Sequence, residues 1–337
     1  MYTVVYPDSM SSDNFSIEKK IAKTNVELVG FGAKNISEIP IKTLNKADAL
    51  VTGIQLKIDK QLIQNLKNCK IITRAGVGYD LIDIKAAGKA GIVVCNVPDY
   101  GTYEVADHAI ALMLNFARGI SIYHKLLQED LEANWGYLNA PLVSRLCGRT
   151  LGIVGLGRIG TACALRAKSF GLNIIFYDPY VPDGQDKALN INRVKKLTDL
   201  MAQSDYVSIH CLANEETSGL FDSNLLKFCK HGQVLINTAR GVIIDLNAVY
   251  DFLKTGQLGA VGLDVFSSEP PSKSNRLISA WLNKEDWLEG RLVLTPHSAF
   301  YSPDGLSFLR EKALNTCLDY LSNNMIANCV NNIYLKK

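Results

Sequence analysis

Residues 150–160 read TLGIVGLGRIG, an apolar run that passes directly into three spaced glycines. The run is typical of a buried strand, and the residues after it have the pattern of a helix. A G-x-G-x-x-G spacing at a strand–turn–helix boundary is typical of a dinucleotide-binding turn. Gly155 would permit the tight turn, Gly157 would let the backbone approach a pyrophosphate, and Gly160 would let helix and strand pack closely.

The residue that selects between NAD and NADP follows the next strand. The stretch NIIFY (173–177) ends at Asp178, eighteen residues after Gly160. A carboxylate there can accept hydrogen bonds from both ribose hydroxyls of NAD and would repel the 2′-phosphate of NADP. Residues 179–182 contain no arginine. The sequence therefore predicts NAD as the cofactor.

Strand and helix patterns alternate on both sides of the glycine turn. We expect strands at 3–6, 26–31, 49–53, 69–76, 91–97, 206–212, 232–238, 260–266 and 292–297. We expect helices at 11–24, 60–66, 102–128, 158–170 and 303–323. Such βα alternation is typical of parallel sheets covered by helices.

Two domains are expected, because 337 residues exceed one compact core. The last helix follows the second βα series and could pack back on the first domain. The predicted division is therefore residues 1–100 plus 302–337, and residues 101–301 with the nucleotide site.

The composition argues against several classes of protein. Lys plus Arg number 36 against 33 for Asp plus Glu, and this balance of +3 gives no strong field for nucleic acid or anionic lipid. The eight cysteines form no C-x-x-C pair, so we expect buried, reduced thiols and no metal. The chain opens without a signal-peptide pattern and has no run of about 18 apolar residues. We expect a cytoplasmic protein without nucleic-acid or membrane partners.

Three ionisable residues follow strands of the second series. Arg240 follows LINTA, Glu269 follows LDVFSS and His297 follows LVLTP. Ligands bind at the carboxyl ends of strands in open α/β sheets. Taken singly, the three could be a surface charge, a solvated turn residue and a packed core histidine. Together, a cation for a carboxylate, a proton donor and a carboxylate that stabilises imidazolium are sufficient to reduce a 2-keto acid.

Six motifs in order resemble the D-isomer-specific 2-hydroxyacid dehydrogenases. They are GLGRIG (155–160), NTARG (237–241), GLDVFSSEP (262–270) and TPHSAF (295–300), preceded by RAGVGYDLIDI (74–84) with NVPDYGTYEVADHAI (96–110), which resemble the substrate loop and dimerising helix of that family. ALRAKSFGLNIIFYDPYVPDG (164–184) resembles the C-terminal-binding proteins within the family, which are NADH-sensing transcriptional corepressors. The resemblance implies two doubly wound parallel-sheet α/β domains, a Rossmann NAD-binding domain and a flavodoxin-like substrate-binding domain, in a homodimer.

The resemblance also implies a role for each matching residue. Arg240 would hold the substrate carboxylate and carbonyl, His297 would act as acid/base, and Glu269 would be its partner. Further substrate contacts would come from Arg74, Val77, Gly78 and Phe300. Besides the three glycines, the NAD site would comprise Val105, Arg158, Ile159, Asp178, Cys211, Thr217, Thr238 and Asp264.

The pocket departs from the C-terminal-binding branch at two positions. Val77 stands where that branch commonly has serine, and Phe300 stands where it has tryptophan. We expect an NAD-dependent oxidoreductase that acts on the CH–OH group of a D-2-hydroxy acid, with the acid, the cellular direction and the pathway left open. The alternative is an NADH-sensing adaptor with little turnover. The helix after Thr102 is expected to form the dimer contact, and packing within one chain is its alternative.

Overall fold

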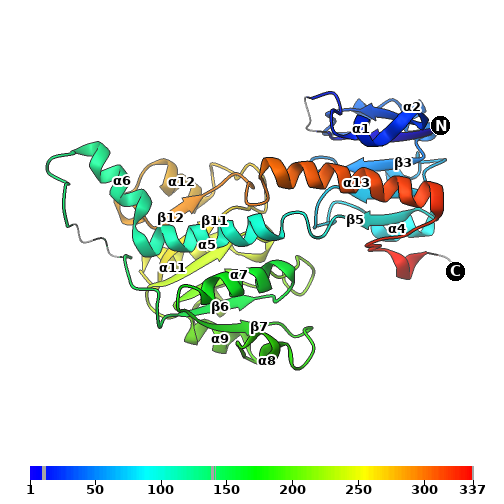
Figure 1. The fold of residues 1–337 in the computed structure, drawn as a ribbon. Helices are drawn as coiled ribbons and strands as arrows, with labels where there is room; N and C mark the ends of the chain where they lie inside the picture. Colours follow the sequence, from blue (N-terminus) through cyan, green and yellow to red (C-terminus); the bar gives the residue numbers. More distant parts are fainter. Residues whose placement is uncertain (10–12, 138–139, 141, 336–337) are drawn as a thin grey trace. The chain divides into compact units, whose positions relative to one another are not determined.

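The computed structural model describes residues 1–9, 13–137, 140 and 142–335. The chain divides into two compact units, Met1–Gly101 with Tyr301–Lys337 (unit 1) and Thr102–Phe300 (unit 2) (Figure 1). The predicted boundaries had Gly101 and Tyr301 in the second domain, whereas the structure has both in unit 1. None of the helices in the described ranges has the length and hydropathy needed to cross a bilayer.

Unit 1 is built on a sheet of five parallel strands in the order β2-β1-β3-β4-β5. This order is that of flavodoxin-like doubly wound sheets. The strands are β1 (Tyr2–Tyr6), β2 (Val26–Gly30), β3 (Ala49–Thr52), β4 (Ile71–Arg74) and β5 (Val93–Asn96). Side chains of a strand alternate between two apolar layers, and Val4 and Val5 of β1 lie in different ones.

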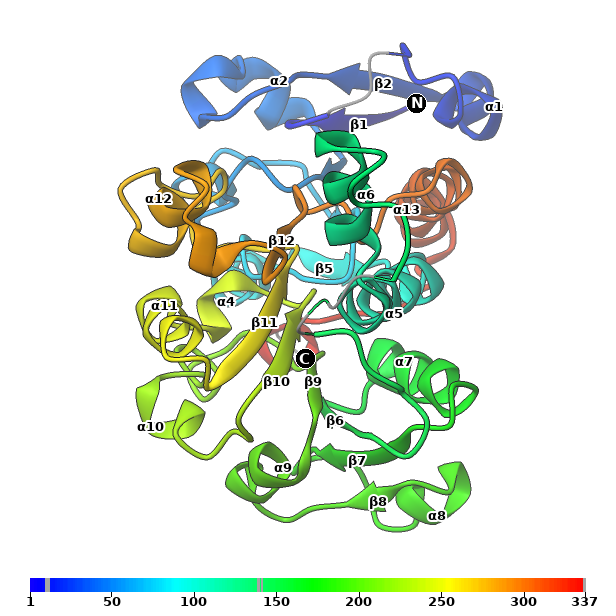
Figure 2. The same cartoon turned by 90° about the vertical axis from the view of Figure 1, so that its left-hand side faces the viewer.

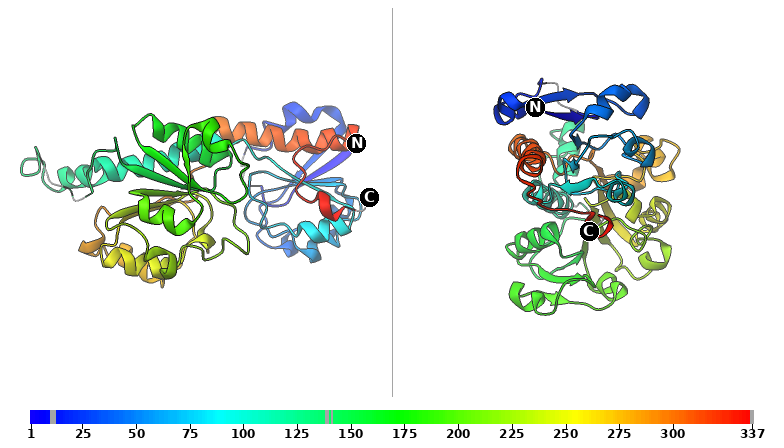
Figure 3. Two further views of the ribbon diagram at one scale, coloured as in Figure 1. Left: turned by 90° about the horizontal axis from the view of Figure 1, so that it is seen from below. Right: turned by 90° about the vertical axis from the view of Figure 1, so that its right-hand side faces the viewer.

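Helices cover both faces of this sheet. One layer includes residues of α1 (Glu18–Ala22) and α13 (Pro303–Asn323), and α13 packs on β3 and β4. The other layer includes residues of α2 (Ile41–Lys46), α3 (Lys60–Ile63) and α4 (Ile84–Lys89). Figure 3 shows α13, in orange and red, running along unit 1. The last helix of the chain thus completes the core of the first unit.

Unit 2 contains seven parallel strands in the order β12-β11-β10-β9-β6-β7-β8. The order reverses between β6 and β9, as in Rossmann sheets. The strands are β6 (Thr150–Val154), β7 (Asn173–Tyr177), β8 (Asn192–Arg193), β9 (Tyr206–Ile209), β10 (Gln233–Asn237), β11 (Leu258–Leu263) and β12 (Leu292–Leu294). The glycine turn follows β6, which lies at this switch point.

The helices of unit 2 also form two layers (Figure 2). One apolar layer contains residues of α5 (Thr102–Arg118) and α7 (Arg158–Lys168). The other contains residues of α9 (Leu197–Gln203), α10 (Ser223–Leu226), α11 (Leu246–Lys254) and α12 (Arg276–Leu282). The short α8 (Gln185–Leu189) precedes β8.

Two helices differ from the sequence prediction. The expected helix at 102–128 is divided into α5 and α6 (Ile120–Glu129) by Gly119, whose φ is 65°. The expected helix at 11–24 is reduced to α1 and a 3-10 turn at Lys23–Asn25, because Asn14 and Phe15 have positive φ values that a right-handed helix does not allow. Residues 10–12 lie outside the described ranges.

The cysteines also differ in part from the prediction. All eight are free, as expected, but Cys147 is exposed, and Cys211 and Cys329 are only partly buried. No group of three metal-ligating side chains occurs in the part of the chain that the structure describes.

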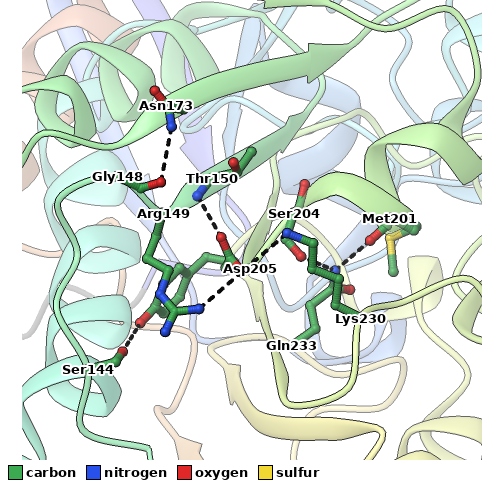
Figure 4. A network of polar contacts seen from close by, with 11 residues as sticks. Ser144, Gly148, Arg149, Thr150, Asn173, Met201, Ser204, Asp205, Lys230 and Gln233 are labelled. Carbon is green, nitrogen blue, oxygen red and sulfur yellow. Dashed lines mark hydrogen bonds and ion pairs between the residues drawn. The ribbon is translucent and has the colours of Figure 1, made fainter.

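The amino ends of the central strands of unit 2 are tied together by polar contacts (Figure 4). The Asp205 carboxylate accepts a hydrogen bond from the Thr150 N–H at 2.8 Å and lies 3.2 Å from Lys230 Nζ. The Gln233 side-chain amide donates to the Ser204 carbonyl at 2.7 Å. These contacts join β6, β9 and β10 at the amino ends of the strands. The glycine turn lies at the opposite, carboxyl ends of the strands.

Candidate active site

The three glycines of the turn differ in the space around them. Gly155 has φ 91°, and a Cβ atom there would lie 2.6 Å from the Cys211 backbone nitrogen. At Gly160 a Cβ would lie 2.1 Å from the Gly155 carbonyl oxygen, so helix α7 could not approach the strand. A Cβ at Gly157 would meet no atom within 4 Å. Protein packing therefore explains Gly155 and Gly160, whereas Gly157 borders open space.

The start of α7 fits a bound pyrophosphate. Gly157 is the N-cap of this 11-residue helix and has no side chain to cap its amides. Arg158, which is exposed, and the half-buried Ile159 form the first helical positions. Uncapped amides and the positive end of the helix dipole attract phosphate oxygens. Open space beside Gly157 is where such a group would lie.

Asp178 lies beside the same turn. Its two carboxylate oxygens accept hydrogen bonds from the N–H groups of Leu156 and Tyr180, at 2.8 and 2.9 Å. Each oxygen keeps acceptor capacity for a ribose hydroxyl. The contact between Gly155 and Cys211 brings the loop after β9 to this edge, and Thr217 Oγ1 donates to the Leu212 carbonyl at 2.6 Å within that loop.

The carboxylate of Asp264 organises the loop that carries His297. The side chain is 1% exposed. Its Oδ1 accepts from Thr295 Oγ1 at 2.5 Å and from the Ser298 N–H at 2.9 Å, and its Oδ2 accepts from the Ala299 N–H at 3.0 Å. Its backbone carbonyl accepts from the His297 N–H at 2.8 Å. Thr238, the other residue expected here, is buried, and its hydroxyl has no hydrogen-bond partner among the described residues.

His297 is paired with Glu269. The imidazole Nδ1 lies 2.6 Å from Glu269 Oε2, and Glu269 Oε1 accepts from the Phe266 N–H at 3.0 Å. The backbone of His297 has φ 51°, a left-handed conformation that is uncommon for residues other than glycine and is held by the contacts to Asp264. Because Nδ1 faces the carboxylate, Nε2 is the ring nitrogen that can face a substrate.

Glu269 has a pKa below its ordinary value. Burial of the carboxyl group on its own raises the pKa, but the hydrogen bonds from His297 and the Phe266 N–H outweigh burial. The charges of His297 and Arg240 act in the same direction as these hydrogen bonds. Glu269 is therefore ionised at neutral pH and can stabilise an imidazolium at His297.

Arg240 follows β10 on a loop that touches the Glu269 loop. A Cβ at Gly241 would lie 1.9 Å from the Phe266 carbonyl carbon, so only glycine allows the two backbones to approach this closely. The Asn237 side chain accepts from the Ala239 N–H and donates to the Arg240 carbonyl, both at 2.9 Å. The structure thus brings Arg240, Glu269 and His297 to one edge of unit 2.

The remaining residues expected to bind substrate or nicotinamide belong to different units. The Phe300 ring lies edge-on to His297 in unit 2, with ring centroids 6.1 Å apart, and Val105 is buried in α5 of the same unit. In unit 1, Arg74 is the last residue of β4, and Val77 and Gly78 lie in the loop that follows this strand. There Arg74 is buried and donates to the Ala75 carbonyl, and the Val77 carbonyl accepts from Asn96 Nδ2 at 2.7 Å.

Two residues to which the sequence motifs assigned no role support the His297 loop. Thr295 donates to Asp264, as described above, and His108 Nε2 of α5 lies 3.0 Å from Thr295 Oγ1. His108 Nε2 is also 3.8 Å from Asp264 Oδ1. The available signal was a histidine inside the apolar pattern of the helix, where it interrupts the buried face.

Comparisons with known proteins show what this chain is similar to. Residues 110–299 match the family described as D-isomer specific 2-hydroxyacid dehydrogenase, NAD binding domain. The chain is 35% identical to C-terminal-binding protein 1 of Caenorhabditis elegans over 88% of this chain and 40% of that protein. It is 37% identical to D-3-phosphoglycerate dehydrogenase of Archaeoglobus fulgidus over 87% of this chain and 50% of that protein. The chain thus spans half or less of the length of these curated relatives.

A solved structure extends the likeness over almost the whole chain. The D-lactate dehydrogenase of Aquifex aeolicus, complexed with NAD and lactic acid, superimposes with a TM-score of 0.82 at 25% identity. The match covers 95% of this chain and 96% of that one. Both units of the fold are therefore included in the likeness.

A Gly157→Ala substitution tests whether the pyrophosphate of the cofactor binds beside Gly157. The added methyl group meets open space and the φ of −75° suits alanine, so thermal unfolding should remain within about 1 °C of the unchanged chain. NADH affinity, measured by fluorescence titration, should fall at least tenfold, which is about 1.4 kcal/mol. Gly160→Ala is the matched comparison and should lower the Tm because of its clash with Gly155. Unchanged NADH affinity in Gly157→Ala would place the pyrophosphate elsewhere.

The lowered pKa of Glu269 predicts a pH-dependent contribution to stability. The unfolded chain protonates this group at a higher pH than the folded chain does. The contribution is therefore complete above the ordinary pKa of about 4.5 and is lost as the pH falls through the folded value. Urea unfolding should be measured from roughly pH 5.5 to 3.5, a range in which histidine is charged. The difference in the free energy of unfolding between the unchanged chain and Glu269→Gln should become smaller as the pH falls. A constant difference across this range would contradict the assigned environment.

Proposed function

The chain belongs to the D-isomer-specific 2-hydroxyacid dehydrogenase family, and on that premise we propose that it is an NAD-dependent oxidoreductase. Its reaction interconverts a small D-2-hydroxy acid and the corresponding 2-keto acid. The observation that carries the proposal is the 2.6 Å pair between His297 Nδ1 and Glu269 Oε2, with Arg240 close enough to lower the pKa of Glu269. His297, Glu269 and Arg240 lie at one end of the sheet, and this supports their roles as proton donor, stabilising carboxylate and cation for the substrate.

Each side chain has a different role in the reduction of the keto acid. The cofactor, when bound, supplies the hydride for the carbonyl carbon. Arg240 binds the substrate carboxylate and polarises the carbonyl through its planar guanidinium. His297, protonated and held at Nδ1 by Glu269, donates a proton from Nε2 to the carbonyl oxygen. In the reverse direction the neutral Nε2 accepts the hydroxyl proton of the D-2-hydroxy acid.

NAD is the proposed cofactor. The matched family domain and the NAD-complexed relative support it. The glycine turn with Arg158 and Ile159 would hold the pyrophosphate, and Asp178 would hold the ribose and disfavour the 2′-phosphate of NADP. Cys211 and Thr217 would lie on the adenosine side. Val105, Asp264 and the unpartnered hydroxyl of Thr238 would face the nicotinamide end.

We assign substrate binding to the first predicted domain, residues 1–100 plus 302–337. The loop after β4 would contribute backbone groups of Val77 and Gly78, and Arg74 would add a second positive charge. Phe300 would contribute an aromatic wall beside His297. A homodimer through the α5 region and a cytoplasmic location complete the proposal.

The likeness to C-terminal-binding protein 1 favours one second candidate function. In that case the chain would be an NADH-sensing adaptor that keeps the catalytic set but turns over slowly. The two candidates differ in turnover and agree in NADH binding.

NADH oxidation with a panel of 2-keto acids separates them. The panel contains glyoxylate, pyruvate, hydroxypyruvate and longer or thioether acids, and we expect turnover with at least one. His297→Asn should lower kcat by roughly 10²–10⁴, which is the usual contribution of a general acid. Arg240→Ala should raise KM roughly 100-fold, because two charge-assisted hydrogen bonds are lost. Full activity in His297→Asn would exclude it as the proton donor, and tight NADH binding without turnover of any acid would favour the adaptor.

A further inference from the structure

The C-terminal segment after α13 is docked on unit 1. Asn331 is fully buried there, its Oδ1 accepts from the Val94 N–H at 2.9 Å and its Nδ2 donates to the Ile92 carbonyl at 2.9 Å. The segment also packs on α4, where a Cβ at Gly88 would lie 2.5 Å from Tyr334 Cβ. Figures 1 and 3 show the red end of the chain beside the cyan β5 and α4.

This docking places two cysteines opposite each other. Cys95 of β5 and Cys329 form an isolated antiparallel bridge. The hydrogen bonds are made by their neighbours: the Val330 N–H donates to the Val94 carbonyl at 2.8 Å, and the Asn96 N–H donates to the Asn328 carbonyl at 3.3 Å. The two cysteines are therefore a non-hydrogen-bonded pair, with side chains on the same face and Cα atoms about 4.5 Å apart.

That spacing suits a disulfide. Disulfide-linked residues have Cα atoms about 4.4–6.8 Å apart, so the bond needs no rearrangement of the backbone beyond rotation of the two side chains. The remaining thiols of unit 1 are differently placed. Cys317 lies on α13 in contact with Thr73 Oγ1 at 3.1 Å, and Cys69 contacts the Ile71 carbonyl at 3.3 Å.

The two thiols differ in their access to solvent. Cys95 is 0% exposed, and burial, followed by the nearby Cys329 and Cys317, raises the pKa of its thiol to about 12. Cys329 is only partly buried, and its thiol donates to Asn331 Oδ1 at 3.4 Å. A small oxidant would therefore reach Cys329 first, and Cys95 would be the second thiol to react.

We propose that Cys95 and Cys329 form a reversible intramolecular disulfide when the chain meets a peroxide. The Cys329 sulfur attacks one peroxide oxygen, the O–O bond breaks, and a sulfenic acid and one water are formed. The Cys95 sulfur then attacks the Cys329 sulfur, the S–S bond forms, the S–O bond breaks and a second water leaves. The two thiols lose two electrons and two protons, and hydrogen peroxide is reduced to two waters. A thiol reductant reverses the bond.

The disulfide would tie the end of the chain to the strand that supports the substrate loop. Asn96, the residue after Cys95, donates to the Val77 carbonyl at 2.7 Å. The cross-link would close a chain segment running through most of the molecule, so it restricts the unfolded state and should raise the Tm. The site does not depend on the proposed dehydrogenase activity, because both thiols and their contacts lie within unit 1.

Peptide mapping after oxidation tests the proposal. The full chain, reduced and then freed of reductant, is exposed to hydrogen peroxide, blocked with N-ethylmaleimide and digested without reduction. We expect one linked pair of peptides that contain Cys95 and Cys329, and its loss after dithiothreitol. The oxidised chain should have a higher Tm than the reduced chain.

Two variants serve as controls. Cys147→Ser removes the exposed cysteine of unit 2 and should leave both the linked peptides and the rise in Tm intact. Cys329→Ser should abolish both, and Cys329→Ala replaces it if the serine variant does not fold. A link from Cys95 or Cys329 to any other cysteine, or Cys329 oxidised to sulfinic acid while Cys95 stays reduced, would overturn the proposal.

Discussion

The geometry of the site depends on the hydrogen bonds that the buried carboxylate of Asp264 accepts. A buried charge without partners is very unfavourable, and Asp264 avoids that cost with three donors, all from residues 295–299. Those donors fix the path of the loop, including the left-handed backbone of His297. The imidazole can then reach Glu269, whose own loop is held against the Arg240 loop at Gly241.

The stabilising polar contacts and the candidate site residues lie at opposite ends of the strands of the unit 2 sheet. Polar contacts around Asp205 join three strands at their amino ends, where no site residue lies. At the carboxyl edge the strands end in the glycine turn, Asp178, the Arg240 loop and the Asp264 loop. This arrangement follows from a parallel sheet, because all carboxyl ends meet at one edge.

Much of this structure could be predicted from the sequence, and the exceptions have physical causes. The bounds of α13 were correct, since Ser302 caps the helix and Pro303 begins it. The prediction of one continuous helix over residues 102–128 was wrong, because the apolar periodicity continues through Gly119 and does not reveal the positive φ of this residue. The apolar strand patterns predicted that Arg240, Glu269 and His297 follow strands. Their distances could not be predicted, since they depend on backbone amides of Ser298 and Ala299 and on His108 from a distant helix.

The dependence of His297 on Asp264 can be measured by NMR of the chain labelled with ¹⁵N-histidine. A proton shared between Nδ1 of His297 and the Glu269 carboxylate should give a strongly downfield-shifted resonance in the unchanged chain. In Asp264→Asn the amide cannot accept the same three hydrogen bonds, so the loop should shift and this resonance should disappear, while the signals of the buried His210 remain. Retention of the resonance at the same position in Asp264→Asn would contradict the role given to the buried carboxylate.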